Sequence, residues 1–304
     1  MAEVGNGVHG PGTVYLNGEF VPYSEAKVPA EDRGYLFGDG IYEVVRFYAG
    51  QPFGWEEHMD RWERSAAGIR LELPWRREDL LQIARELQRR NGLESAPLAD
   101  FYLQATRGAA PRSHAFPAGV RPSLFALLRE GQAHPEAERQ EGVAVITVPD
   151  ERWGRCDLKT LNLLPNVLAK QRAKDAGAYE ALLVRSGGYV SEGSSSNVFA
   201  IIHGAVVTPP LQNILPGITR LTVLNIARRL RLPVYERPLT VGEILRAESA
   251  FLTGTTTEIL PIRTLDGEAV GEGRRSPVLD QLQKEFAQVT GAGGGDTLCR
   301  TERI

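Results

Sequence analysis

The sequence predicts a mixed α/β protein that folds as two domains. Its 304 residues exceed the usual size of a single domain. Strand-like and helix-like patterns occur in both halves, and the polar, turn-forming run 131–135 separates them. We therefore expect a small α/β domain over residues 14–130, a linker over 131–136 and a large domain over 137–304. Residues 1–13 are glycine-rich and without pattern, and we expect them to be disordered.

The N-terminal half begins with a hairpin signal. Asn17-Gly18 lies between two short apolar runs, a pattern that predicts a two-residue turn. A loop punctuated by glycines follows at 34–40. Further strands are expected at 41–48, 100–106 and 122–128, and helices at 58–69 and 77–90.

The C-terminal half starts again with strand patterns. Strands are expected at 143–148, 158–161, 180–184, 189–190 and 197–202, and helices at 165–175, 219–230 and 277–289. A glycine-rich tail at 291–295 is expected to be mobile. Strands and helices therefore mix in both halves.

The composition is that of an ordinary globular protein. Hydrophobic residues make up 42% of the chain and charged residues 24%, and the net charge is −3 at pH 7, so no surface for nucleic acid is indicated. The apolar runs are too short to cross a bilayer, and the first residues lack the pattern of a secretion signal. We therefore expect a cytoplasmic protein with no membrane partner. Cys156 and Cys299 lie in different contexts, and neither a disulfide nor a metal site is expected.

Lys159 is the most informative residue, because it alone among five lysines lies in a mostly apolar stretch. We interpret it as a buried amine. A desolvated lysine loses proton affinity and becomes a nucleophile that can form a Schiff base with a carbonyl compound. Pyridoxal phosphate is the commonest such partner in enzymes. The alternative is a lysine that extends its amine to solvent from a strand edge.

Two segments of the C-terminal half can bind a phosphate group. Gly217-Ile218-Thr219 opens the helix at 219–230, where backbone amides and the positive helix end would face an anion. Thr255-Thr256-Thr257 follows a strand and offers hydroxyl groups. The alternative for both segments is that they only cap the next element.

A third segment combines a carboxylate with hydroxyls. Glu192 is followed by Gly193 and three serines before the next strand. This is either a plain loop or an arrangement that holds a protonated pyridine nitrogen and bonds a ring or phosphate oxygen. No Gly-x-Ser-x-Gly elbow surrounds the serines, which argues against a serine hydrolase.

Five motifs closely resemble those of fold type IV pyridoxal phosphate transaminases, the class IV aminotransferases. They occur in the family's order, and the resemblance covers about residues 14 to 290. The motifs are EDRGYLFGDGIYEVV at 31–45, EHMDR at 57–61, LKTLN at 158–162, SEGSSSN at 191–197 and GITR at 217–220. The resemblance implies a small N-terminal α/β domain and a larger, cofactor-binding domain with a mostly β core flanked by helices. It also implies pyridoxal 5′-phosphate as the cofactor.

The resemblance assigns roles to individual residues. Lys159 would be the Schiff-base residue and the proton shuttle, Glu192 the partner of the pyridine nitrogen and Arg61 a ligand of the phosphate. From the residues alone, Arg61 would be an ordinary arginine on a helix. The other cofactor-binding residues that the resemblance implies are Ser194, Ser195, Leu215, Ile218, Thr219 and Thr255.

A basic loop bears on the substrate. Arg112 and His114 would normally be solvated charges, but in a loop over an apolar pocket they can bind a carboxylate together with a tyrosine hydroxyl. With Tyr42, the Arg-x-His pattern resembles the carboxylate trap of D-amino acid transaminases, in which the arginine and histidine come from the neighbouring subunit of a homodimer. The substrate-binding residues expected on this basis are Tyr42, Val44, Arg46, Arg112, His114 and Thr256.

Two positions distinguish members of the family. Branched-chain L-amino acid transaminases commonly carry a tyrosine five residues after the lysine, whereas this chain has Leu164 there. This departure favours the D-type interpretation. Arg46 stands where close D-type relatives have a lysine, at the rim of the pocket. The substrate contacts of those relatives therefore carry over less closely to this chain at that position.

The resemblance therefore implies a homodimeric aminotransferase that exchanges amino groups between D-amino acids, such as D-alanine or D-glutamate, and 2-oxo acids, such as pyruvate or 2-oxoglutarate, by a ping-pong mechanism. The alternatives on the same scaffold are a branched-chain L-amino acid transaminase, an (R)-amine transaminase and aminodeoxychorismate lyase. Arg112 and His114 argue against the lyase. A protein that had lost activity is disfavoured because Lys159 and Glu192 are both present.

Overall fold

The computed structural model describes residues 12–273 and 275–291, and the chain divides into two compact units. Unit 1 is the chain up to Gln132 together with Lys159–Asn162. Unit 2 is Ala133–Leu158 together with the chain from Leu163 onward. The first residue of unit 2, Ala133, falls inside the linker that we expected at 131–136. The segment Lys159–Asn162, however, belongs to unit 1 rather than to the large domain.

The two segments expected to lack structure fall mostly outside the described residues. These are residues 1–11 of the expected extension and 292–295 of the expected tail. At the edges of both segments the prediction was wrong. Thr13 is the first residue of a strand, and Gly291 is the last residue of a helix.

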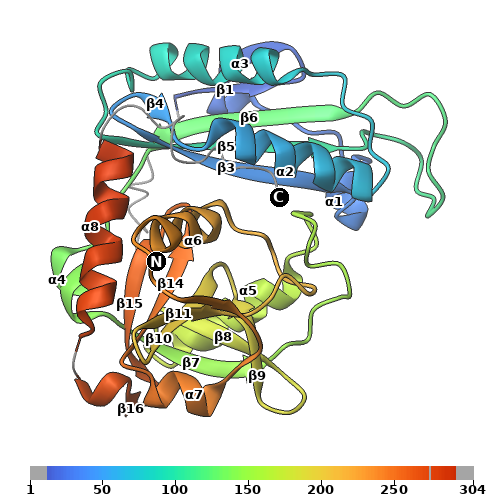
Figure 1. Ribbon diagram of the computed structural model, residues 1–304. Helices are drawn as coiled ribbons and strands as arrows, with labels where there is room; N and C mark the ends of the chain where they lie inside the picture. Colours follow the sequence, from blue (N-terminus) through green and yellow to red (C-terminus); the bar gives the residue numbers. More distant parts are fainter. Residues whose placement is uncertain (1–11, 274, 292–304) are drawn as a thin grey trace, which may run out of the picture. The chain divides into compact units, whose positions relative to one another are not determined.

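Unit 1 is built on a six-stranded antiparallel sheet in the order β2-β1-β6-β5-β3-β4 (Figure 1). The strands are β1 (Thr13–Leu16), β2 (Glu19–Pro22), β3 (Gly40–Tyr48), β4 (Gln51–Pro52), β5 (Leu98–Thr106) and β6 (Ser123–Glu130). The predicted Asn17-Gly18 turn joins β1 and β2, and both turn residues have positive φ, 53° and 107°. β3 pairs with β5 along its whole length.

Two helices, α2 (Trp55–Gly68) and α3 (Arg77–Arg90), share one hydrophobic core with the sheet of unit 1. On α3 the buried positions are Leu80, Ile83, Ala84, Leu87 and Gln88, the spacing of one helix face. Residues of β3, β5 and β6 that alternate along each strand complete this core. The opposite side chains of β3, which include Tyr42, Val44 and Arg46, therefore share the other face, as predicted.

Two further segments of unit 1 differ from the prediction. The glycine-punctuated loop contains a short helix, α1 (Arg33–Phe37), because Asp32 caps its first turn and Gly38 ends it in the left-handed conformation. A 3₁₀ turn, η1, follows β2 at Tyr23–Glu25. Neither element has an apolar period long enough to be seen in the sequence.

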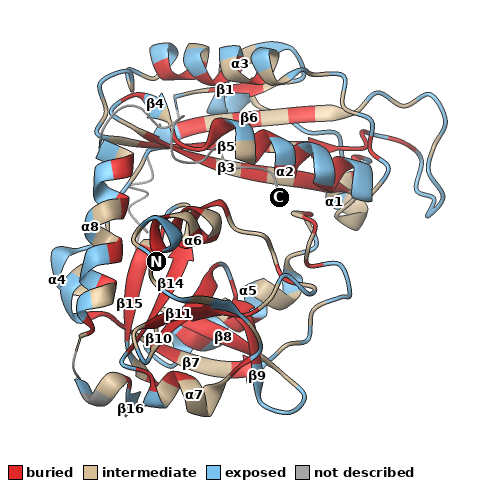
Figure 2. Cartoon of the chain, viewed as in Figure 1, coloured by how far each residue is buried: buried red, intermediate tan, exposed pale blue. Residues whose placement is uncertain are grey.

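Unit 2 contains a ten-stranded mixed sheet. Nine strands follow the order β12-β11-β10-β14-β15-β7-β8-β9-β13, and β16 pairs with β15. The strands are β7 (Val143–Pro149), β8 (Glu180–Arg185), β9 (Tyr189–Gly193), β10 (Asn197–Ile202), β11 (Ala205–Thr208), β12 (Val234–Glu236), β13 (Leu239–Thr240), β14 (Ser249–Gly254), β15 (Glu258–Leu265) and β16 (Glu268–Ala269). Figure 2 shows that buried residues run along β10 and β14, which confirms a mostly β core.

Helices flank the sheet of unit 2. They are α4 (Glu136–Glu141), α5 (Leu164–Asp175), α6 (Ile218–Arg229), α7 (Val241–Arg246) and α8 (Pro277–Gly291), with a 3₁₀ turn, η2, at Gly271–Gly273. Ala169 and Ala173 of α5 pack against β7 and β8, and α6 packs against α8 and β14. In the ranges that the structure describes, no helix is both long and apolar enough to cross a membrane.

The strand that we predicted at 158–161 does not form. Within this segment Thr160 makes an isolated bridge with Ile41. Backbone hydrogen bonds from Tyr42 N to Lys159 O (3.0 Å) and from Leu161 N to Gly40 O (3.1 Å) tie the segment to the start of β3. The β-branched and apolar residues there reflect burial beside another strand rather than a strand of their own.

Leu87→Ala should lower the free energy of unfolding by about 2–5 kcal/mol, because it opens a cavity in the core of unit 1. Leu87 is fully buried. Gln82→Ala, at an exposed position of the same helix, should change it by less than about 0.5 kcal/mol. Urea unfolding of both variants measures the difference, and equal effects would contradict the assignment of the buried face of α3.

Candidate active site

A buried group of ionisable side chains lies where β3 faces α2 in unit 1. Arg61 donates from Nε and Nη2 to the two carboxylate oxygens of Glu43, at 2.7 and 2.8 Å. The Nδ1 atom of His58 lies 2.8 Å from Glu43 Oε2. All three side chains are at most 3% exposed. The guanidinium predicted to bind a phosphate is therefore held in a fixed direction by a bidentate bond.

The charges of this group determine its protonation. Burial alone would raise the pKa of Glu43, but the charge of Arg61 and the hydrogen bonds from Arg61 and His58 lower it far below its usual range. Burial lowers the pKa of His58, and Arg61 and Lys159 lower it further, against the opposing effect of Glu43. At neutral pH the group is an ionised pair with a neutral imidazole.

Lys159 lies against an aromatic ring at the start of β3. Its Nζ is 4.2 Å from the centre of the Tyr42 ring, a cation–π distance. Its backbone N donates to Ser65 Oγ at 3.0 Å. The side chain is half-buried, so the sequence-based expectation of a buried amine was too strong. The amine is held by the ring of Tyr42 rather than by surrounding apolar packing.

Tyr42 belongs to an aromatic row on the same face of the sheet. Its ring stacks on Tyr102 of β5 at 5.9 Å, and Tyr102 contacts Phe125 of β6 at 6.4 Å. Burial, together with Tyr42, raises the pKa of Tyr102 to about 12, so this hydroxyl stays protonated. Sequence reasoning missed Tyr102, whose only signal was its register opposite Val44.

Arg46 lies on this face too, but it is already bonded. Its Nε donates to Asp100 Oδ1 at 2.8 Å, and its Nη2 donates to Asp100 Oδ2 and to the carbonyl of Gln132. The side chain is 2% exposed. Arg46 and Asp100 oppose each other across β3 and β5, which explains the pairing. The expected role of Arg46 and Val44 at the substrate stays a prediction.

The loop that carries Arg112 and His114 connects β5 to β6. Both side chains are exposed, and both lie beside Phe37 of α1. The Cζ atom of Arg112 is 5.3 Å from the centre of that ring, and the His114 ring is 5.5 Å from it. The structure therefore brings the two predicted carboxylate ligands to the same aromatic side chain.

In unit 2, Glu192 is buried at the end of β9 and bonded at both oxygens. Arg152 Nη1 donates to Oε1 at 2.5 Å, and Asn197 Nδ2 donates to Oε2 at 3.0 Å. The backbone N of Leu215 lies 3.2 Å from each oxygen. Arg152 in turn donates from Nε and Nη2 to the two carboxylate oxygens of Asp150, at 2.8 and 3.0 Å.

Burial and the neighbouring arginine have opposite effects on the pKa of Glu192. Burial raises the pKa of Glu192 to about 7, although the charge of Arg152 and its hydrogen bond lower it. The neighbouring Asp150 has its pKa lowered to about 2, because its bonds to Arg152 and Ser191 outweigh burial. Sequence reasoning missed Arg152 and Asp150; their signal was a polar Asp-Glu-Arg run directly after β7.

The serines after Glu192 bond a second buried carboxylate. Ser194 Oγ donates to Glu180 Oε1, and Ser195 Oγ and Ser196 Oγ donate to Oε2 at 2.9 and 3.0 Å. Glu180 is fully buried on β8. The hydroxyls that we expected at the cofactor therefore hold the turn between β9 and β10 in place. A direct role of Ser194 and Ser195 at the cofactor stays a prediction.

The first turn of α6 offers free backbone amides. Gly217 is its N-cap, with no side-chain cap bond and no acidic residue in the first turn. A Cβ at Gly217 would lie 2.1 Å from Asn197 Oδ1, so only glycine fits. Asn197 also donates to the carbonyl of Leu215 at 3.0 Å. Unit 2 thus brings Glu192, Leu215 and the start of α6 together.

A second hydroxyl-bearing turn follows β14. Thr253 Oγ1 is buried and has no hydrogen-bond partner among the described residues, and Thr255 and Thr256 follow it in the turn to β15. A Cβ at Gly254 would lie 3.6 Å from the carbonyl of Ser195. The threonine turn therefore neighbours the serine segment that follows Glu192.

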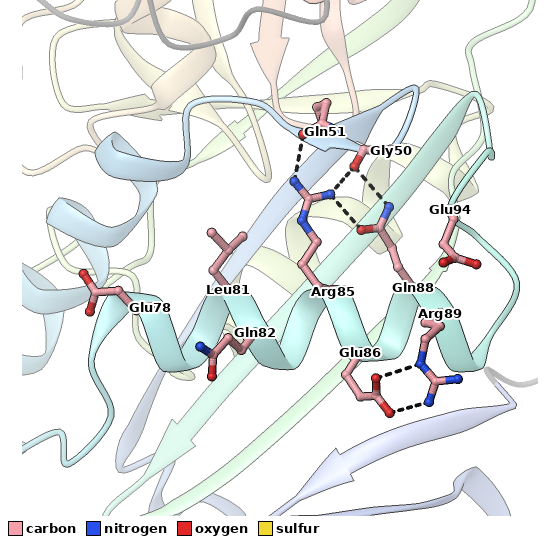
Figure 3. Close-up of a pocket in the computed structure, with 10 residues that line it drawn as sticks. All are labelled: Gly50, Gln51, Glu78, Leu81, Gln82, Arg85, Glu86, Gln88, Arg89 and Glu94. Atoms are coloured by element: carbon pink, nitrogen blue, oxygen red, sulfur yellow. Dashed lines mark hydrogen bonds and ion pairs between the residues drawn. The ribbon is translucent and has the colours of Figure 1, made fainter.

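Unit 1 also has a surface pocket of about 690 Å³ beside α3 (Figure 3). Its central cation, Arg85, donates to the carbonyl of Gly50 at 2.5 Å and to Gln51 Oε1 at 2.7 Å. Gln88 Nε2 donates to the same carbonyl. These bonds hold Arg85 and Gln88 to the turn at Gly50 and Gln51, and none of the residues that we predicted for the site lines the pocket. Across the described residues, no group of three His, Cys, Asp or Glu side chains could hold a metal ion.

Comparison with known proteins gives the class of the protein. The family model described as amino-transferase class IV matches residues 40–265. The chain belongs to this family, and the prediction from the five motifs is confirmed. Members of the class are aminotransferases that use pyridoxal phosphate. This protein is therefore an aminotransferase that depends on pyridoxal phosphate.

Individual relatives point to a particular member. The chain is 44% identical to the D-alanine aminotransferase of Staphylococcus haemolyticus over 275 residues, 90% of this chain and 96% of that protein. Among solved structures, it resembles the branched-chain amino acid aminotransferase of Escherichia coli with a TM-score of 0.88, 27% identity and coverage of 95% and 97% of the two chains. It also resembles the PLP-form of the branched-chain enzyme of Thermobaculum terrenum, with a TM-score of 0.79, 27% identity and coverage of 94% and 95%.

The residues of unit 2 fit the groups of pyridoxal phosphate. A phosphate suits the uncapped amides of Ile218 and Thr219 and the unpartnered hydroxyl of Thr253. A pyridine nitrogen that carries a proton suits the carboxylate of Glu192, which Arg152 keeps in place. The prediction of the cofactor is confirmed by the family, whereas the role of each of these residues in holding it stays a prediction.

Glu43→Gln should lower the free energy of unfolding by about 3–5 kcal/mol at neutral pH, because Arg61 would stay buried without this counter-charge. The control is Glu63→Gln at the surface, where a 52% exposed carboxylate binds Arg77; it should cost less than about 1 kcal/mol. Urea unfolding of the two variants makes the comparison.

The pH dependence of the same variant tests the ionisation of Glu43. Its pKa is lower in the folded protein than its ordinary value of 4.5, so its contribution to stability is present above that pH and is lost as the pH falls. The difference between wild type and Glu43→Gln should therefore shrink in acid. A difference that stays constant down to about pH 3 would refute an ionised Glu43.

Proposed function

We propose that this enzyme transfers amino groups between D-amino acids, such as D-alanine and D-glutamate, and 2-oxo acids, by a ping-pong cycle. The observation that carries the assignment is its similarity to D-alanine aminotransferases, at a higher identity than to the branched-chain structures. Arg112, His114 and Tyr42 support it, because two cationic or hydrogen-bonding side chains and a phenol can bind a carboxylate. Leu164, in place of the tyrosine common in branched-chain enzymes, supports it as well.

We propose the following roles for the residues that hold the cofactor. Lys159 bonds it covalently through Nζ in the resting enzyme. Glu192 keeps the proton on the pyridine nitrogen, with Leu215 beside the ring. Arg61 and the amides of α6, with Ser194, Ser195, Thr219 and Thr255, bind its oxygens. When bound, pyridoxal phosphate supplies an electron sink for the negative charge that develops at the substrate Cα.

The proton transfers fall to Lys159. With the cofactor and substrate bound, the Nζ of Lys159 would take the proton from the substrate Cα, hold it and give it back within the same site. Arg112 and His114 fix the carboxylate and so decide which enantiomer points its Cα hydrogen toward the amine. Two charge-assisted contacts thereby select D over L substrates. Val44, Arg46 and Thr256 complete the proposed substrate site.

We also propose that the enzyme is a homodimer, in which Arg112 and His114 of one chain serve the site of the other. Both side chains are exposed in the single chain. Leu164, Val167 and Leu168 of α5 are 68%, 58% and 49% exposed and share one helix face, which a second copy would bury. A cytoplasmic location is supported by the free thiol of Cys156. Neither nucleic acid nor membrane is proposed as a partner.

Lys159→Ala should reduce transamination by at least about a hundredfold, because it removes both the covalent attachment and the proton carrier. Lys174→Ala, an exposed lysine of α5, should leave the rate unchanged. Borohydride reduction followed by peptide mapping should place the pyridoxyl group on residue 159 of the wild type and of the Lys174 variant. A label elsewhere would overturn the assignment.

Arg112→Ala should raise the KM for D-alanine by about 10- to 150-fold, the loss of one charge-assisted hydrogen bond worth about 1.5–3 kcal/mol. Arg121→Ala, on the same loop and exposed, is the control and should have little effect. Half-reactions with D-alanine, L-leucine and an (R)-arylalkylamine, followed by the cofactor's colour change, test the substrate class. Faster reaction of L-leucine or of the amine than of D-alanine would contradict the proposed function.

A further inference from the structure

Asp39 in unit 1, whose side chain is 11% exposed, binds two arginines that sequence reasoning did not single out. Asp39 follows α1, and its Oδ2 accepts from Arg33 Nε at 2.8 Å and from Arg107 Nε at 2.8 Å. Its Oδ1 accepts from Arg107 Nη2 at 2.9 Å. Arg33 is 3% exposed and Arg107 8%. Two guanidinium groups therefore share one carboxylate at a position with little exposure to solvent.

The remaining nitrogens of Arg33 bind the loop that carries Arg112 and His114, here called the carboxylate loop (residues 111–116). Nη1 donates to the carbonyls of Ser113 at 2.5 Å and Ala115 at 3.4 Å, and Nη2 donates to the carbonyl of His114 at 3.3 Å. One buried guanidinium thus contacts three successive carbonyls. Only a planar fork with five donors can do this.

Arg107 holds the far end of the carboxylate loop through an aromatic ring. Its Cζ lies 3.7 Å from the centre of the Phe116 ring, and the Cζ atom of Arg70 lies 4.8 Å from the same centre. Arg107 is itself fixed, since it donates to the carbonyls of Ile69 and Arg70 at 2.8 Å each. Phe116 is 46% exposed, so this contact, rather than core packing, locates it.

The beginning of the loop is fixed by the backbone. Gly108 has φ of 91°, and a Cβ there would lie 2.2 Å from the carbonyl of Arg121. Its carbonyl accepts from Arg33 N at 2.9 Å. The side chains at the middle of the loop meet Phe37, over which Arg33 lies at 4.9 Å. The ion cluster, Phe37 and the loop therefore form one connected set of contacts.

Removing the three charges of this cluster from water costs desolvation free energy. Buried ion pairs are often no more stabilising than apolar side chains of the same size. Burial would raise the pKa of Asp39, but Arg107 and Arg33 lower it below its ordinary value, so the cluster is charged at neutral pH. An exposed loop that must bind a substrate gains affinity when it is ordered beforehand.

We propose that Arg33, Asp39 and Arg107 are positioning residues for substrate binding: they fix the carboxylate loop so that Arg112 and His114 present their side chains in one geometry. This inference rests on the proposed function, in which those two residues bind the substrate carboxylate. Arg33 is the central member, because it joins Asp39 to three carbonyls of the loop. A lysine would keep its charge and lose the fork.

The first test is hydrogen exchange of the holoenzyme. In Arg33→Lys, the amides of residues 112–116 should exchange at least about tenfold faster, because the loop is released, while those of α2 and β5 keep their rates. Arg85→Lys is the matched control. Arg85 also clamps a carbonyl, that of Gly50 on the far turn of unit 1 (Figure 3), so it should leave the loop unchanged.

The second test separates positioning from a general structural role. In Arg33→Lys the KM for D-alanine should rise about tenfold with little change in kcat. The rate of the half-reaction with an (R)-arylalkylamine, which has no carboxylate, and the absorption spectrum of the bound cofactor should stay as in wild type. A purely structural defect would instead lower all of these together, and Arg85→Lys again serves as the control.

The outcomes distinguish this inference from the proposed function. If Arg112→Ala raises the KM for D-alanine but Arg33→Lys alters neither exchange nor KM, positioning is refuted and the function stands. If exchange accelerates while Arg112→Ala leaves D-alanine unaffected, the loop is held as described but does not bind the carboxylate. Should Arg33→Lys fail to fold, Phe116→Ala decides: it removes the stack on Arg107 at the surface, and unchanged exchange of the amides of residues 112–116 overturns the inference.

Discussion

The candidate site depends on how β3 divides its side chains between two faces of the sheet. Glu43 points toward α2 and is locked there by Arg61 and His58, whereas its neighbour Tyr42 points the opposite way and meets the amine of Lys159. Alternation along the strand imposes this division. A shift of register by one residue would exchange the two faces. The full-length pairing of β3 with β5 prevents such a shift.

Four largely buried carboxylates in this protein are each bonded to several groups. Glu43, Asp39, Asp150 and Glu180 each accept at least three hydrogen bonds from side chains or backbone. A single ion pair inside a protein seldom repays the desolvation of two charges. Fully bonded groups do, and they are rigid as a result. Glu43 and Asp39 lie within three residues of Tyr42, Asp150 is joined to Glu192 through Arg152, and Glu180 bonds Ser194 and Ser195. The rigidity is therefore placed beside residues with a proposed chemical role.

Much of the fold could be predicted from the sequence, because long amphipathic periods and the Asn-Gly turn are local signals. The helix at 77–90 agrees with α3 at both ends. Short elements such as α1, and the segment at 158–161, could not be predicted, because their conformation depends on capping and on contacts with β3. Lys159, Glu192 and the loop with Arg112 stood out through residue type and resemblance. Arg33, Asp39, Arg152 and Glu180 did not, since their roles come from partners distant in sequence.

The four residues Lys159–Asn162 also affect the order in which the two units can complete their folding during synthesis. They complete the edge of unit 1 through backbone bonds to Gly40 and Tyr42, yet they are preceded by Ala133–Leu158, which belongs to unit 2. During synthesis on the ribosome, the first unit therefore cannot finish folding when residue 132 emerges. It must wait, with the start of β3 unsatisfied, until part of the second unit has been translated.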